Sequence, residues 1–287
     1  MTVAERLRDA AAALGPGAST ARLDVELLMA HALGVSRSDL LLRHMRDPAP
    51  PAFEPLLARR RASEPVAYIL GHAEFWSLDL AVTPAVLIPR ADSETLVEVA
   101  LAARPDAQRV LDCGTGSGAL LLAVLSALPE ARGVGIDRSP GALAVAAGNA
   151  ERTGLAARAA FHERDWDVPG WASGLDRFDL ILANPPYVED AAELEAVVRD
   201  HEPAGALFAG AEGLDAYRVL VPQLPGLLAP GGVALVEIGW RQAEAVAAIA
   251  AGAGLSARLH RDLGGRPRAL EMAILPKISL GKAPSAD

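Results

Sequence analysis

Short apolar runs of strand length alternate with stretches of helix length through most of this 287-residue chain, beginning at Asp92. This alternation favours an α/β fold with a doubly wound, mainly parallel sheet that carries helices on both faces. The clearest helices are predicted at Leu214–Leu228 and Gln242–Ala251. Because Asp262–Arg268 is too short for a crossover connection, we expect the last two strands to pair antiparallel. The predicted strands are Arg109–Cys113, Gly133–Asp137, Ala157–Glu163, Asp179–Ala183, Gly232–Ile238, Ala257–Arg261 and Ala269–Leu275.

Residues 3–62 instead show helical periodicity interrupted by loop-forming residues, which predicts a separate helical unit. Gly15-Pro16-Gly17 ends the first helix, and Ser19 or Thr20 can cap the second. The predicted helices are Val3–Leu14, a second helix that ends at Gly34 with Leu23, Leu27, Leu28, Ala30 and Leu33 on its apolar face, the short Ser36–Leu42, and Phe53–Ala62 after a linker at Asp47–Pro51.

The alternating run Phe75–Val82 predicts a β-hairpin between the helical unit and the sheet. We therefore divide the chain into a helical domain at 1–64, a hairpin linker at 65–90, a sheet domain at 91–276 and a disordered tail at 277–287. Near the end of the helical domain, Arg59-Arg60-Arg61 is either a solvated helix end or a contact for RNA or an acidic partner.

The net charge of −9 is concentrated outside the helical domain. Residues 1–64 carry nine Lys+Arg against eight Asp+Glu, and the remainder carries 18 against 28. An enzyme that acts on nucleic acid usually has a basic surface at its site. The distribution therefore disfavours direct nucleic-acid binding.

Cysteine and histidine usage exclude several classes of site. The single cysteine, Cys113, permits no internal disulfide, which fits a reducing compartment, and no Cys-His pattern supports it as a nucleophile. The six histidines lack metal-ligand spacing, so no metal site is indicated. No signal segment and no apolar stretch of about 18 residues is present, so we expect a soluble, cytoplasmic protein.

The tetrapeptide Asn184-Pro185-Pro186-Tyr187 follows a buried-strand pattern at Phe178–Ala183. Two consecutive prolines lack N–H groups and cannot extend a strand, so the chain must leave the sheet at Asn184. Ligands of open α/β sheets bind at the carboxyl ends of strands. An asparagine amide oxygen and a proline carbonyl there suit the orientation of a substrate NH2 group, although a plain turn is the alternative interpretation.

A second candidate segment, Gly114–Gly118, lies between a short strand and the start of a helix. Its alternate glycines let the backbone turn sharply and pass close to a bound molecule. Asp137 ends the next strand about 20 residues later, as expected for an acid that accepts hydrogen bonds from ribose hydroxyls. Alternatively, Asp137 caps the helix that begins near Ser139-Pro140.

Together these features resemble the class I S-adenosylmethionine-dependent methyltransferases. Within them, the chain is similar to the N5-glutamine methyltransferases of peptide-chain release factors, the HemK/PrmC family. Ala91 stands where the family usually has proline, and Ser93-Glu94 replaces the more frequent sequence acid-Thr-Glu. The Asn-Pro-Pro-Tyr turn alone is less specific, because adenine-N6 methyltransferases share it. Further matching segments are Glu64–Gly71, Leu87–Arg90, Glu212–Tyr217 and Glu237–Gly239.

The resemblance implies a seven-stranded Rossmann-like sheet that binds S-adenosyl-L-methionine. Trp166 would lie beside the adenine, or be a half-buried loop tryptophan. Arg90, with Pro89, either lines the pocket or forms a surface ion pair with Asp92 or Glu94. The implied cofactor contacts are Gly114, Thr115, Gly116, Ser117, Gly118, Asp137, Trp166 and Asn184. The implied catalytic residues are Asn184, Pro185 and Tyr187. The implied substrate contacts are Asn184, Pro185, Pro186 and Tyr187.

The reaction implied by the resemblance is methyl transfer to the side-chain nitrogen of the glutamine in the Gly-Gly-Gln motif of class I release factors. The helical domain 1–64 would dock this protein substrate. We expect a monomer with no direct nucleic-acid partner and no membrane partner. Three alternatives stay open: a glutamine of a ribosomal protein, adenine N6 of DNA or RNA, and a cofactor-binding module without catalysis.

Overall fold

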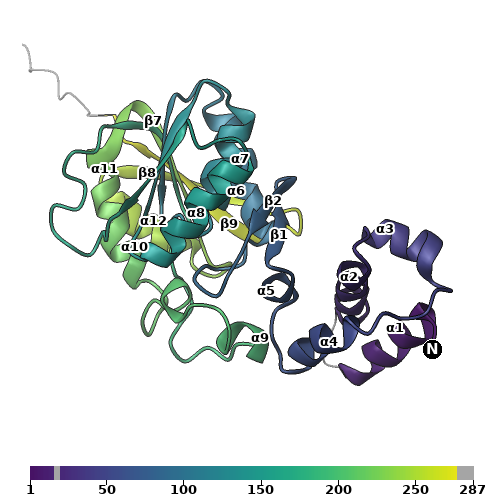
Figure 1. Cartoon of the computed structure of the whole chain (residues 1–287). Helices are drawn as coiled ribbons and strands as arrows, with labels where there is room; N and C mark the ends of the chain where they lie inside the picture. The colour runs from purple at the N-terminus through teal and green to yellow at the C-terminus, as the bar shows by residue number, and fades with distance from the viewer. Residues whose placement is uncertain (16–19, 277–287) are drawn as a thin grey trace, which may run out of the picture.

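The computed structural model describes residues 1–15 and 20–276 of the chain. It shows a helical unit followed by a β-hairpin and a sheet with helices on both faces (Figure 1). The predicted tail 277–287, Pro16-Gly17 of the first helix break and the candidate cap Ser19 lie outside the described residues.

The main sheet consists of β3 (Arg109–Cys113), β4 (Arg132–Asp137), β5 (Ala159–Glu163), β6 (Phe178–Ala183), β7 (Leu228–Glu237), β8 (Leu255–Arg261) and β9 (Pro267–Ile274). Its strand order is β5-β4-β3-β6-β7-β9-β8. The neighbours from β5 to β7 are parallel, whereas β9 pairs antiparallel with β7 and β8. The predicted doubly wound sheet and its antiparallel final pair are confirmed.

Helices cover both faces: α6 (Glu94–Ala103), α7 (Ala119–Ala127) and α8 (Pro140–Arg152) lie on one, and α10 (Asp215–Leu220), α11 (Leu224–Leu227) and α12 (Ala243–Gly252) on the other (Figure 1). Val110 and Leu180 pack toward α6 and α7, whereas Leu111 and Ile181 pack toward α10, α11 and α12. Because successive side chains enter two separate cores, these strands read as uninterrupted apolar runs.

The predicted helix Leu214–Leu228 is wrong as a single element. It is divided into α10, a 3₁₀ turn at Val221–Gln223 and α11, and Leu228 already belongs to β7. Pro222 and Pro225 explain the division, because each lacks an N–H and its ring crowds the preceding helical turn.

The linker hairpin is present, but its predicted run covers only part of it. The strands are β1 (His72–Phe75) and β2 (Leu78–Ala81), which pair antiparallel. Trp76 and Ser77 form the turn with positive φ angles of 52° and 60°. Neither is glycine, so the usual composition signal for a tight hairpin turn is missing from the sequence.

The helical unit contains α1 (Val3–Ala13), α2 (Ala21–Leu33), α3 (Arg37–Asp39), a π-helical turn at Leu40–His44, α4 (Phe53–Arg61) and α5 (Val66–Leu70). Thr2 starts α1 with a capping box, in which its hydroxyl accepts from the Glu5 N–H and its own N–H donates to the Glu5 carboxylate. Val3, Leu28 and Phe53 form part of a separate apolar core.

Helix α2 differs from its predicted apolar face. Leu23 is 42% exposed, whereas Asp24 and Glu26 are buried. Arg60 pairs with Asp24 at 2.7 Å, and Arg22 and Arg37 pair with Glu26. Leu28 and Ala30 are buried as predicted, and Leu33 packs against the same core, so the prediction is wrong for Leu23 and missed the two acids. The arginines neutralise the buried carboxylates, which hydrophobic periodicity alone does not reveal. Thr20 is the N-cap residue, but its side chain makes no capping hydrogen bond.

Two of the three consecutive arginines at the end of α4 also form ion pairs. Arg59 pairs with Glu64 at 2.5 Å, and the Arg60 side chain, which pairs with Asp24, is only 14% exposed. The predicted solvated helix end is therefore wrong for Arg60. Its charge holds α4 against α2.

We predict that Asp24→Asn lowers the free energy of unfolding by about 3 kcal/mol, because it leaves the Arg60 guanidinium largely buried without its counter-charge. Urea unfolding of the two proteins measures the difference. Asp9→Asn, which removes an exposed pair with Arg8, is the matched control and should leave stability unchanged. Equal midpoints for Asp24→Asn and the wild type would show that the buried pair contributes nothing.

Candidate active site

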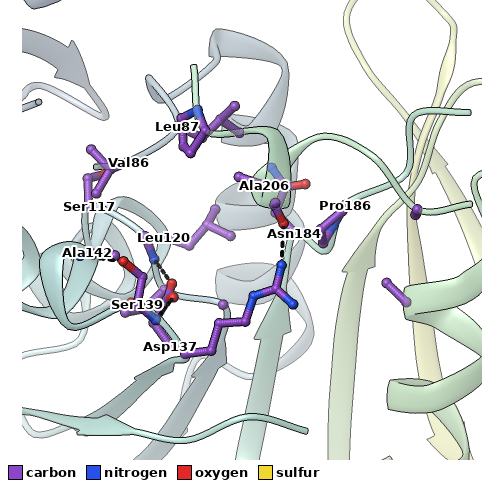
Figure 2. A pocket seen from close by; sticks show the side chains of 18 of the residues that line it. Val86, Leu87, Ser117, Leu120, Asp137, Ser139, Ala142, Asn184, Pro186 and Ala206 are labelled. Atoms are coloured by element: carbon purple, nitrogen blue, oxygen red, sulfur yellow. Dashed lines mark hydrogen bonds between the residues drawn. The ribbon is translucent and has the colours of Figure 1, made fainter. Parts of the chain in front are cut away.

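A cavity of about 430 Å³ opens at the carboxyl ends of β3, β4 and β6. The glycine loop, the end of β4, the Asn-Pro-Pro-Tyr turn and the linker all contribute to its wall. Figure 2 shows Asp137 and Ser139 at one side, Asn184 and Pro186 at the other, and Val86 and Leu87 of the linker above them.

Strand register explains why these segments meet. Cys113 at the end of β3 is in register with Ile136 of β4 and with Ala183 of β6. The residues that follow these three positions therefore leave the sheet at the same level. The glycine loop, Asp137 and Asn184 become neighbours although they are far apart in the sequence.

The glycine loop requires glycine for its backbone conformation. Gly114, Gly116 and Gly118 have φ angles of +74°, +54° and +82°. A Cβ atom on Gly114 would lie 3.1 Å from the Trp166 ring. The contact with Trp166 and the positive φ angle therefore both exclude larger residues there. Gly118 is the N-cap of α7 and does not line the cavity, whereas Gly114, Thr115, Gly116 and Ser117 do.

Asp137 is half-buried at the cavity wall and holds the glycine loop in place. Its Oδ2 accepts from the Gly116 N–H at 3.0 Å, and its Oδ1 accepts from the Ser139 N–H at 2.9 Å. The first turn of α8 is capped by the Ser139 hydroxyl, which accepts from the Ala142 N–H. Helix capping is thus performed by Ser139, and each Asp137 oxygen retains a second acceptor position.

Trp166 is half-buried and also lines the cavity, with its ring against Gly114. Gln223 donates to the Trp166 carbonyl at 3.1 Å, which fixes the backbone of this loop. The cavity therefore has an indole surface next to the glycine loop and a carboxylate at the end of the adjoining strand.

Asn184 lies between the main cavity and a smaller one of about 120 Å³. Its Nδ2 donates to the Ser93 hydroxyl at 3.3 Å. No hydrogen bond to its Oδ1 is found within residues 1–15 and 20–276. The amide oxygen is therefore available to accept from a bound molecule.

The rest of the turn is divided between the two cavities. Pro186 lines the larger one, Tyr187 lines the smaller one, and Pro185 is buried behind them. The Tyr187 hydroxyl donates to Glu237 at 3.4 Å, and Gln242 donates to the Tyr187 carbonyl at 3.0 Å. Burial, followed by the nearby Glu237 charge, raises the pKa of Tyr187 to about 12.

Arg90 lines both cavities and forms a 2.5 Å ion pair with Glu202. The predicted surface pairs are wrong: Asp92 pairs with Arg268, and Glu94 accepts from the Trp76 N–H. Pro89 lines the larger cavity beside it, as expected.

Three buried carboxyl groups near the site escaped prediction: Asp112, Glu202 and Glu237. Burial raises the pKa of Asp112 to about 7, although the Thr115 hydroxyl donates to it at 2.7 Å. Burial likewise raises the pKa of Glu237 to about 7. For Asp112 and Glu237 the available signal was an acid within or at the end of an otherwise apolar strand, because such an acid must find partners; Glu202 lies outside the strands and gave no such signal.

The remaining reactive groups do not form a further site in the described part of the chain. Cys113 is buried, and burial raises the pKa of its thiol well above the usual value, which disfavours a nucleophile. Among residues 1–15 and 20–276, no group of three or more His, Cys, Asp or Glu side chains is placed to hold a metal ion. Within the same residues, no helix combines the length and apolar character needed to span a membrane.

Two family models match the chain: a PrmC N-terminal domain over residues 5–71 and a methyltransferase domain over residues 105–260. A release factor glutamine methyltransferase from Rhodospirillum rubrum is 45% identical, over 94% of this chain and 86% of that protein. One from Geobacter sulfurreducens is 47% identical, over 80% of this chain and 81% of the relative. One from Moorella thermoacetica is 44% identical, over 93% of this chain and 97% of that protein.

We predict that Gly114→Ala weakens S-adenosylmethionine binding by about tenfold or more, because a Cβ at φ +74° is strained and presses on the Trp166 ring. Isothermal titration calorimetry measures the change. Gly148→Ala is the control, since a Cβ at this position of α8 meets no atom within 4 Å. Equal affinities for both variants would contradict the assigned role of the loop.

Proposed function

Because this chain belongs to the family of release factor glutamine methyltransferases, we propose that it methylates the side-chain amide nitrogen (N5) of a glutamine in a peptide-chain release factor. The target is the glutamine of the Gly-Gly-Gln motif of class I factors, and the methyl donor is S-adenosylmethionine. The observation that carries this proposal is the position of Asn184, whose amide lies between the two cavities.

The larger cavity fits S-adenosylmethionine in size and chemistry. Its volume is within the range of small-molecule sites. Asp137 would accept from the ribose hydroxyls, the Trp166 ring would cover the adenine, and the glycine loop would approach the methionine part closely; all three line this cavity. When bound, the cofactor supplies an electrophilic methyl group on its sulfonium.

The protein's task at the acceptor is to position a weak nucleophile. The lone pair of an amide nitrogen is delocalised into the carbonyl, and no base near Asn184 is strong enough to remove its proton first. Asn184 Oδ1 and the Pro185 carbonyl would each accept one N–H and hold the nitrogen in line with the methyl group. Positioning of this kind contributes several kcal/mol, and both oxygens stabilise positive charge that develops on nitrogen. The extra proton then leaves to water.

Tyr187 would cover the flat amide of the substrate in the smaller cavity. The hydrogen bonds of its hydroxyl to Glu237 and of its carbonyl to Gln242 hold the ring and its backbone. A ring fixed at both ends can exclude water from the reacting nitrogen without losing further rotational freedom.

The helical domain 1–64 would dock the release factor beside the site. The linker that follows it contributes Val86 and Leu87 to the cavity wall, and His201 approaches the Ala62 carbonyl at 3.4 Å. Figure 1 shows α4 and α5 on the side of the sheet domain where α9 (Ala196–Arg199) lies. A protein loop bound to this domain would therefore reach the cavity over a short distance.

The proposal extends to a cytoplasmic monomer without direct nucleic-acid contact. The acidic excess of residues 65–287 disfavours a polyanionic substrate.

We predict that Asn184→Ala lowers turnover by at least about a hundredfold while cofactor affinity changes far less, because the oxygen that orients the nucleophile is lost. Single-turnover transfer of labelled methyl groups from S-adenosylmethionine to purified release factor measures the rate, and mass spectrometry locates the methyl group on the Gly-Gly-Gln peptide.

Parallel reactions with DNA, RNA and ribosomal protein test the other acceptors. Methylation of one of these by the wild type, with none on release factor, would overturn the proposed substrate. A near wild-type rate for Asn184→Ala would overturn the positioning mechanism.

We predict that a chain lacking residues 1–62 binds S-adenosylmethionine but does not methylate intact release factor, because the docking surface is gone. Calorimetry with the cofactor reports whether the sheet domain is folded. Unchanged methylation by a truncated chain that binds cofactor normally would contradict a docking role for the helical domain.

A further inference from the structure

Beneath Asn184, side chains from three distant segments form a chain of hydrogen bonds. Asn184 Nδ2 donates to the Ser93 hydroxyl at 3.3 Å, and the Ser93 hydroxyl donates to Glu237 Oε2 at 2.5 Å. Ser93 ends the 3₁₀ turn Ala91–Ser93, and Glu237 ends β7. Both side chains are buried, at 4% and 1% exposure, so water does not compete for these bonds.

We propose that Ser93 and Glu237 are positioning residues that hold the Asn184 amide with its oxygen toward the substrate. This inference rests on the proposed function, because it specifies how the acceptor for the glutamine N–H is oriented. The resemblance to known methyltransferases implies no role for either residue: Ser93 departs from the family's usual sequence, and Glu237 is only part of a matching segment.

Proton accounting gives the orientation. A serine hydroxyl has one hydrogen to donate, and Ser93 donates it to the Glu237 carboxylate. Only lone pairs remain toward Asn184, so they accept from its NH2 group and leave Oδ1 on the opposite side. A flipped amide would bring two acceptors together and present an NH2 group to the substrate N–H. Such a site cannot bind the nucleophile productively.

Glu237 also accepts hydrogen bonds from two tyrosines, one at its carboxylate and one at its backbone carbonyl. The Tyr187 hydroxyl donates to Glu237 Oε1, and the Tyr217 hydroxyl of α10 donates to the Glu237 carbonyl at 2.9 Å. Glu237 therefore connects the amide that holds the nucleophile to the ring proposed to cover it. One displacement of this carboxylate would disturb both.

The protonation state of Glu237 determines whether this orientation is enforced. Burial raises the pKa of Glu237 to about 7, and the charge of Asp92 acts in the same direction. The hydrogen bonds from the Ser93 and Tyr187 hydroxyls and the charge of Arg268 from β9 favour the charged form and oppose this shift. Protonated Glu237 can donate to Ser93, which frees the serine proton for Asn184 Oδ1 and permits the flip. Turnover should therefore fall as the pH drops through about 7, where the carboxylate is lost.

The chain contains only two asparagines, Asn149 and Asn184, so asparagine labelled with ¹⁵N gives two side-chain NH2 signals. Asn149 donates to the carbonyls of Ala81 and Ser117 and serves as an internal reference. We expect the Asn184 signal of the full-length protein to titrate near pH 7, to shift in Ser93→Ala, and to lose its titration in Glu237→Gln. The Asn149 signal should stay constant.

The same variants are assayed for methyl transfer. Ser93→Ala and Glu237→Gln should lower kcat by at least about tenfold with little change in cofactor affinity, and Glu237→Gln should remove the contribution of Glu237 to the pH dependence near 7. Ser93→Thr, which keeps the hydroxyl, should restore most of the rate. Ser126→Ala, which removes a hydroxyl bonded within α7, is the control and should behave as the wild type.

An Asn184 NH2 signal that ignores both Ser93→Ala and pH would overturn the inference, whatever the acceptor of the methyl group. So would wild-type kcat in both variants, or a loss in Ser93→Ala that Ser93→Thr shares in full. A wild-type enzyme that shows the expected NMR behaviour but does not methylate release factor would support the positioning role and overturn only the proposed substrate.

Discussion

The parallel pairing of β3 with β4 and β6 brings the glycine loop, Asp137 and Asn184 to one edge of the sheet. Cys113 is in register with Ile136 on one side and Ala183 on the other, so three loops leave the sheet at one level. Each loop contributes something different: a backbone without side chains at the glycines, the carboxylate of Asp137 and the amide of Asn184. None of the three segments would form a site alone, because the groups come together only at this edge of the sheet.

The site is supported from within the protein by carboxyl groups that accept hydrogen bonds from hydroxyls. Thr115 donates to Asp112 behind the glycine loop, and Ser93 donates to Glu237 behind Asn184. A buried carboxylate is costly unless such donors compensate for lost water. Replacing Thr115 or Ser93 by an apolar residue of similar size would leave a buried carboxylate without its donor. The glycine loop and the Asn184 turn are therefore sensitive to such substitutions.

Glu202 holds the linker, which follows the helical unit, at the wall of the cavity. The Glu202 carboxylate accepts from the Ile88 N–H and from the Arg90 guanidinium, and it is almost fully buried. This contact ties the segment after β6 to the linker that covers the cavity. A protein substrate bound on the helical unit would thus meet a cavity wall whose position is already fixed.

The sequence by itself determined the features that follow from local rules. Apolar runs of strand length predicted the sheet, consecutive prolines predicted the kink at Asn184, and alternate glycines predicted the loop after β3. Tertiary structure alone decided that Asp24 faces inward on α2, and that Ser93 donates a hydrogen bond to Glu237, 144 residues away, beneath Asn184. Hydrophobic periodicity indicates which apolar side chains are buried. It does not indicate which buried polar groups form hydrogen bonds or ion pairs with one another, because the partners are determined by strand register and by the packing of segments that are distant in the chain.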